Sequence, residues 1–114
     1  MNEELERVEY TSLLYDFYGV LLSETQREVM SLYHEDNLSL SEIAEELGQS
    51  RQAVHYTLKK AEKALEAFEE KLGLIESYDE DRALAERAIT LLEKEDMSAD
   101  DRSAVMDILK KITE

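Results

Sequence analysis

Residues 39–60 read SLSEIAEELGQSRQAVHYTLKK, and this stretch decides the fold. Ser39 is followed three residues later by Glu42, a pair of side chains that typically caps the start of a helix. Gly48 stands where the end of that helix needs a left-handed residue. Ser50 then suits the first cap of a second helix. Two capped helices separated by a three-residue turn predict a helix-turn-helix.

Three residues at fixed spacing support this prediction. If Leu40 is counted as position 1, Ala44 is at position 5, Gly48 at position 9 and Val54 at position 15. Ala44 must be small because the second helix crosses over it, and Val54 packs back between the two helices. Gly48 turns the chain with positive φ, which costs other residues about 1 kcal/mol or more. Two unrelated amphipathic helices could share this spacing by chance, but the caps and the apolar positions agree with the turn as well.

The remainder of the chain also favours helices. It contains no proline and three glycines, whereas sheet proteins need frequent turn formers. We predict an all-α fold with a first helix over residues 3–18 and a second from the Ser23 cap to about residue 34. The predicted fold also contains a long fourth helix over residues 51–78. Two further helices follow, one over residues 79–94 and one that begins at the Ser98 cap. The side chains expected to be buried outside the helix-turn-helix are mainly Leu5, Val8, Leu14, Tyr15, Phe17, Tyr18, Val29, Met30, Leu32, Tyr33, Leu84, Ala88, Ile89, Leu91, Leu92, Val105, Met106, Ile108, Leu109 and Ile112.

The fourth helix carries a heptad-like apolar seam. Its members are Val54, Leu58, Ala61, Leu65, Phe68, Leu72 and Ile75. A helix of this length projects beyond a three-helix core, so the far half of the seam must be covered by the C-terminal helices, by a second copy of the chain, or by both. We therefore predict one domain: residues 1–78 form the helix-turn-helix core with its long helix, and residues 79–114 form a C-terminal helical hairpin with no independent fold. We also expect a homodimer.

The charge is strongly negative and unevenly distributed. The formal net charge is −15, with −10 in residues 1–47, +1 in residues 48–75 and −6 in residues 76–114. Such a field repels a nucleic acid backbone. The chain has no cysteine, no apolar run that could span a bilayer and no signal-peptide pattern. We expect a cytoplasmic protein with no membrane association.

Seven residues of the second helix of the motif would face a DNA groove. Arg51 and Gln52 can form bidentate contacts with bases, and lysines and Ser50 can meet phosphates. Each also has a plainer role, because Ser50 caps the helix in any case and the lysines can simply be solvated. The candidate nucleic-acid-binding residues are Ser50, Arg51, Gln52, His55, Tyr56, Lys59 and Lys60.

No constellation of residues indicates catalysis. His34 and His55 lie on different helices without a second ligand at suitable spacing, so no metal site is expected. The carboxylates have no apolar context that would tune them for acid–base work, and there is no glycine-rich phosphate loop. We predict a non-enzymatic protein with no cofactor.

The tract LYDFY at residues 14–18, followed by LLSETQREVMSLYHED and the motif above, resembles the YlxM family of small Gram-positive bacterial proteins. The resemblance covers residues from about 5 to 78, and the last 36 residues match no pattern that we recognise. Residues 39–54 alone are similar to many sigma-factor region 4 domains. YlxM proteins are described as helix-turn-helix proteins associated with the signal recognition particle, which implies a regulatory or accessory role in protein targeting. Compared with sigma factors, the chain lacks a densely basic recognition helix.

Two functions follow as expectations. The first is an interaction protein that contacts protein components of the signal recognition particle pathway, since an acidic chain suits the basic surface of an RNA-binding partner. The second is a dimeric DNA-binding transcriptional regulator that uses the groove-facing residues.

Overall fold

The structure, a computed structural model, describes residues 3–114 and is all-helical over that range. The chain forms two compact units, an N-terminal unit that ends at Gly73 and a C-terminal unit that begins at Leu74. The helices of the N-terminal unit are α1 (Glu3–Tyr18), the 3-10 turn η1 (Gly19–Leu21), α2 (Glu24–Met30), the π-helix η2 (Ser31–Glu35), α3 (Leu40–Leu47) and α4 (Arg51–Leu72). Those of the C-terminal unit are α5 (Leu74–Leu92) and α6 (Ala99–Thr113).

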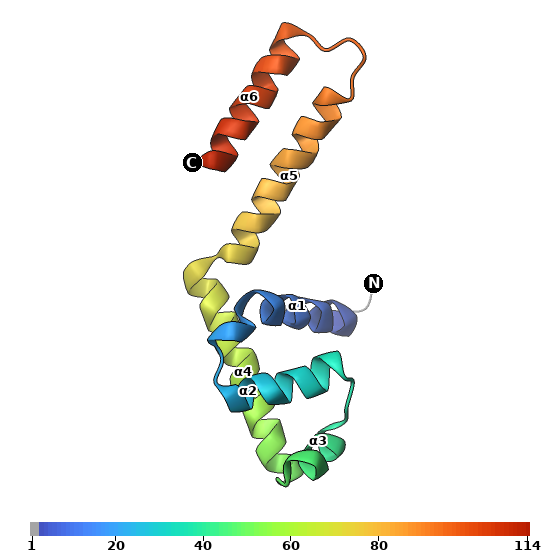
Figure 1. The fold of residues 1–114 in the computed structure, drawn as a ribbon, viewed down its shortest axis with the longest axis vertical. Helices are drawn as coiled ribbons and strands as arrows, with labels where there is room; N and C mark the ends of the chain where they lie inside the picture. The colour runs from blue at the N-terminus through green and yellow to red at the C-terminus, as the bar shows by residue number, and fades with distance from the viewer. Residues whose placement is uncertain (1–2) are drawn as a thin grey trace. The chain divides into compact units, whose positions relative to one another are not determined.

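Helix α4 is the centre of the N-terminal unit. It packs against α1, α2 and α3, as Figure 1 shows. The side chains in this core are almost entirely apolar, so their burial supplies the main stabilising free energy. The core residues are Leu14, Tyr18, Leu22, Val29, Met30, Ile43, Ala44, Val54, Leu58, Ala61 and Leu65.

Helix boundaries follow the capping signals. Ser23 and Ser39 each accept a hydrogen bond from the third residue of the following helix, and the Gln26 and Glu42 side chains accept one from the cap residue's backbone. Ser98 caps α6 in the same way, with Asp101 as the return partner. These caps satisfy amides that have no partner inside the helix. The beginnings of these helices were therefore predictable from the sequence.

The buried face of α1 differs from the prediction. Leu5 is 50% exposed and Val8 is 49% exposed. The stripe that faces the core runs through Leu14 and Thr11, and helical spacing continues it back to Arg7. Leu5 lies off this stripe, so the first two turns of α1 add little to the core.

The end of the second helix also differs. Residues Ser31–Glu35 form a π-helix, in which the amide of Asp36 donates to the carbonyl of Ser31 at 3.1 Å. A π turn is wider than an α turn, so it changes which side chains point inward. His34 is turned inward, with its side chain 6% exposed. Tyr33, which was expected to be buried, is 37% exposed.

The fourth helix is shorter than predicted. It ends at Leu72, because Gly73 adopts φ 61° and ψ 28°, the left-handed conformation of a helix C-cap. The next helix starts at Leu74, so Ile75, the last member of the apolar seam, lies on a different helix from the others. Ala61 and Leu65 have no exposed surface. This part of the seam is therefore not available to a second chain.

The C-terminal unit is a hairpin of two antiparallel helices, which run side by side in Figure 1. Its small core consists of buried Ala88, Val105 and Ile108, with three half-buried residues packed against them, Leu84, Leu91 and Ile112. Four residues that were expected to be buried are half exposed, because a hairpin can cover only one side of each helix. They are Ile89, Leu92, Met106 and Leu109.

Candidate functional site

The turn of the helix-turn-helix is built by Gly48. Its φ of 66° and ψ of 35° are left-handed, and apart from its two chain neighbours no residue has an atom within 4 Å of where a Cβ would stand. The amide of Gln49 donates to the carbonyl of Ala44 at 2.9 Å, which closes the helix end. Other residues are therefore disfavoured at this position because of the left-handed backbone, and not because a side chain would clash with its neighbours. Ser50 follows and accepts a hydrogen bond from the amide of Ala53 at 3.0 Å.

Helices α3 and α4, the two helices of the motif, pack against each other through small and branched side chains. Ala44 is 7% exposed, and Val54 and Ile43 have no exposed surface. The three residues assigned to the motif from spacing, Ala44, Gly48 and Val54, therefore lie at the packing contact and at the turn of a helix-turn-helix. This arrangement holds the outer face of α4 in a fixed position beside α3.

All seven candidate groove-facing residues are exposed. They extend from the Ser50 cap over the first three turns of α4. Two of the lysines interact within the chain. Lys59 Nζ lies 3.4 Å from Glu62 Oε1, and Lys60 Nζ lies 5.5 Å from the centre of the Tyr56 ring. These contacts compete with phosphate contacts, although exposed ion pairs of this kind are weak.

Helix α3, which packs against α4, carries exposed acids. Glu42, Glu45 and Glu46 are exposed on α3. The Ser39 amide donates to Glu42 Oε1 at 2.9 Å, and this bond holds the pKa of Glu42 below its ordinary value. The carboxylate therefore stays ionised, and the exposed surface of α3 is acidic. Acids at this position repel a phosphate backbone and attract a basic surface.

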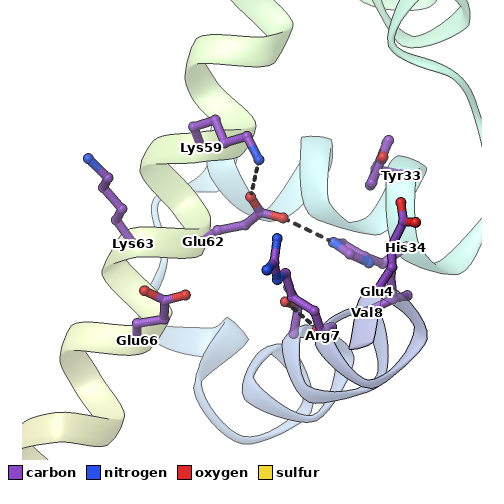
Figure 2. Close-up of a pocket in the computed structure, with 10 residues that line it drawn as sticks. Glu4, Arg7, Val8, Tyr33, His34, Lys59, Glu62, Lys63 and Glu66 are labelled. Carbon is purple, nitrogen blue, oxygen red and sulfur yellow. Dashed lines mark hydrogen bonds and ion pairs between the residues drawn. The ribbon is translucent and has the colours of Figure 1, made fainter. Parts of the chain in front are cut away.

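A pocket of about 470 Å³ lies between α1, η2 and α4 (Figure 2). Its lining combines three basic and three acidic side chains with Val8, Thr11, Tyr33 and His34. In Figure 2 the side chain of His34 points toward Glu62 across the gap between η2 and α4. The mixed charges favour neither an anion nor a cation. The charged lining residues are Arg7, Lys59, Lys63, Glu4, Glu62 and Glu66.

The His34–Glu62 contact is the polar link between η2 and α4. Nε2 of His34 is buried and lies 3.7 Å from Oε2 of Glu62, which is within ion-pair range but beyond hydrogen-bond length. His34 is the largest cause of a lowered pKa at Glu62; partial burial opposes it, and Lys59 assists it. Sequence reasoning missed this pair because the π turn that brings His34 inward has no sequence signal.

The residues that the structure describes hold no cluster of three or more histidine, cysteine or acidic side chains that could bind a metal ion. No helix within residues 3–114 combines the length and the apolar character needed to cross a membrane.

The capped helix pair, the left-handed Gly48 and the exposed face of α4 define a helix-turn-helix protein. The chain belongs to the family described as "Putative helix-turn-helix protein, YlxM / p13 like", whose model matches residues 5–106. The match includes most of the C-terminal hairpin, which carried no recognised pattern in the sequence.

Relatives at 40% identity over 108 residues include UPF0122 proteins of Bacillus cereus strain AH187, Bacillus anthracis strain A0248 and Bacillus thuringiensis subsp. konkukian strain 97-27. The alignment covers 95% of this chain and 98% of each relative. The two compact units therefore occur together in these relatives.

Proposed function

We propose that this chain is a non-enzymatic, cytoplasmic accessory protein of the signal recognition particle pathway, and that it acts through protein contacts. The observation that carries the proposal is the acidic surface of α3 beside the recognition helix, formed by Glu42, Glu45 and Glu46. A protein that binds RNA presents a basic surface, and complementary charge increases the rate and specificity of association. The link to this pathway comes from the likeness to the YlxM family.

A direct binding measurement tests this proposal. The tagged chain is immobilised and titrated with the purified protein subunit of a bacterial signal recognition particle. We expect saturable binding at micromolar concentration. Reversing Glu45 and Glu46 to lysine should weaken it about tenfold or more, because two attractive charges become repulsive.

The control is the double variant Glu93→Lys with Glu95→Lys. It makes the same change of net charge at two exposed residues of the C-terminal unit. This variant should bind nearly as well as the wild type at physiological salt. Equal loss in the two double variants would mean that only net charge matters, and absence of binding at tens of micromolar would remove the proposal.

A second candidate function is DNA binding by α4. The observation in its favour is that all seven candidate side chains are exposed on one capped helix behind a helix-turn-helix turn. Selection of binding sequences from a random duplex pool tests it. An enriched motif whose recognition is lost in Gln52→Ala, with unchanged folding, would support DNA reading over the protein-contact role.

A further inference from the structure

The C-terminal hairpin has an exposed apolar face. Ile89 and Leu92 on α5 are each 56% exposed, and Met106 and Leu109 on α6 are each 50% exposed. Each pair is spaced by three residues, so its members stand one above the other on their helix. We call these four residues the hairpin apolar face.

The four side chains lie on the same side of the hairpin. Each of the four directly follows a residue of the hairpin core, namely Ala88 and Leu91 on α5 and Val105 and Ile108 on α6. In an antiparallel pair of right-handed helices, the positions that follow the core residues turn to the same side. The opposite side carries Arg87, Asp107 and Lys111, which together line a shallow cavity between α5 and α6.

The hairpin is small for a unit with its own core. It begins at Leu74 and buries one side of two helices, whose core cluster includes three buried residues. Units of about 40 residues usually need disulfides, a metal ion or association for stability. The chain has no cysteine. Association with another helical surface would complete this core.

The charge on this side suits a second copy of the chain. A spacing of three or four residues places two acids, Glu86 and Glu93, beside Ile89, and two bases, Arg102 and Lys110, beside Met106. These four charges cancel, whereas the chain as a whole carries −15. Two copies therefore meet with less repulsion across this side than across the acidic remainder of the molecule.

We propose that the hairpin apolar face is the contact surface of a homodimer, in which two hairpins form a four-helix bundle. A stable interface buries about 800 Å² on each partner, somewhat more than half of it apolar. Four half-exposed large side chains supply on the order of 400 Å² of apolar surface, which is close to that requirement. Bundles of four helices with apolar inner faces are a common stable arrangement.

Sedimentation equilibrium of the full-length chain tests the dimer. The wild type should show twice the 13.2 kDa of one chain at tens of micromolar. Ile89→Glu buries a carboxylate in the interface and should raise the dissociation constant about 100-fold or more. Thr90→Glu is the matched control, because the neighbouring residue is exposed on another side of α5 and gains the same charge. Its dissociation constant should stay within about threefold of the wild type.

A second variant, on α6, distinguishes loss of the interface from misfolding. Met106→Glu should also dissociate the dimer, and circular dichroism of each variant at high dilution should match that of the diluted wild type. A wild-type mass near 13.2 kDa would overturn the proposal. So would a dimer that Ile89→Glu and Met106→Glu leave intact, since the two chains would then meet elsewhere.

Discussion

At the scale of single residues, the backbone of Gly48 makes a sharp prediction. Gly48→Val should lower the free energy of unfolding by about 1–3 kcal/mol, because a β-branched residue is strained at a φ of 66°. No neighbouring atom would clash with the new Cβ, so the effect isolates backbone strain. Gly48→Asn should cost less, since asparagine tolerates this conformation. Thermal melts followed by circular dichroism measure both variants, and equal shifts would contradict the assigned role.

Arg51→Ala provides the control for that comparison. Arg51 is exposed in the first turn of α4. Its removal should change the unfolding free energy by less than about 0.5 kcal/mol. A larger loss would show that Arg51 supports the turn and is not simply presented on the recognition helix.

The lowered pKa of Glu62 predicts how stability depends on pH. A carboxyl group whose pKa is lower in the folded chain stabilises the fold above the unfolded pKa, and this contribution is lost as the pH falls through the folded pKa. Glu62→Gln should therefore destabilise the chain by up to about 1 kcal/mol near pH 7 and show little difference at strongly acidic pH.

The matched control for Glu62→Gln is Glu66→Gln. Glu66 is exposed one turn further along α4 and lines the same pocket. The two variants share the change in net charge, so a difference between their urea unfolding curves reports the contacts of Glu62 with His34 and Lys59. Equal curves at every pH would mean that these contacts contribute nothing to stability.

At the scale of helices, capping predicts a position-specific effect on α6. The Ser98 hydroxyl accepts a hydrogen bond from the Asp101 amide at 3.0 Å, and Asp101 also pairs with Lys94 at 3.1 Å. Ser98→Ala should cost about 1 kcal/mol of helix stability. Ser103→Ala, in the exposed interior of α6, should be neutral or slightly stabilising. The helical signal during thermal unfolding compares them, and similar losses would argue against the cap.

The helices also show what the sequence could and could not predict. The beginnings of α2, α3, α4 and α6 were predictable because Ser23, Ser39, Ser50 and Ser98 satisfy local amides through side chains a few residues away. The beginning of α5 was predicted wrongly, at residue 79, because α5 starts at Leu74 directly after the Gly73 C-cap. The end of α4 was not, because the heptad spacing of apolar residues runs across Gly73 and outweighed the glycine in the sequence interpretation. A glycine inside an apolar pattern can be a tolerated helix residue or a C-cap, and only the backbone distinguishes them.

The candidate site, like the helices, was predictable from the sequence only in part. Exposure of the seven residues from Ser50 to Lys60 follows from helical periodicity once the cap of α4 is known. The contact between His34 and Glu62 joins distant parts of the chain through a π turn, and neither the turn nor the contact has a local pattern. Local signals therefore predicted the motif, whereas the pocket beside it required the tertiary structure.

At the scale of the whole molecule, the net charge of −15 governs contacts with nucleic acid. The basic side chains of α4 that can reach phosphates are Arg51, Lys59, Lys60 and Lys63, and Lys59 already pairs with Glu62. Four phosphate contacts per chain correspond to a slope of about −3.6 in log binding constant against log salt. With acids on α3 beside them, we expect dissociation constants for random duplex DNA on the order of 10⁻⁴ M or weaker at physiological salt.

Fluorescence anisotropy with a labelled random duplex, measured over a range of salt concentrations, checks this expectation. Glu45→Gln together with Glu46→Gln should strengthen binding, because it removes two charges next to the recognition helix. Glu93→Gln together with Glu95→Gln makes the same change of net charge outside α3. A smaller effect of this control would assign the gain to the acids of α3 and not to net charge alone. Tight binding by the wild type, with a slope well beyond −3.6, would require basic contacts outside α4 and would favour a nucleic acid partner over a protein partner.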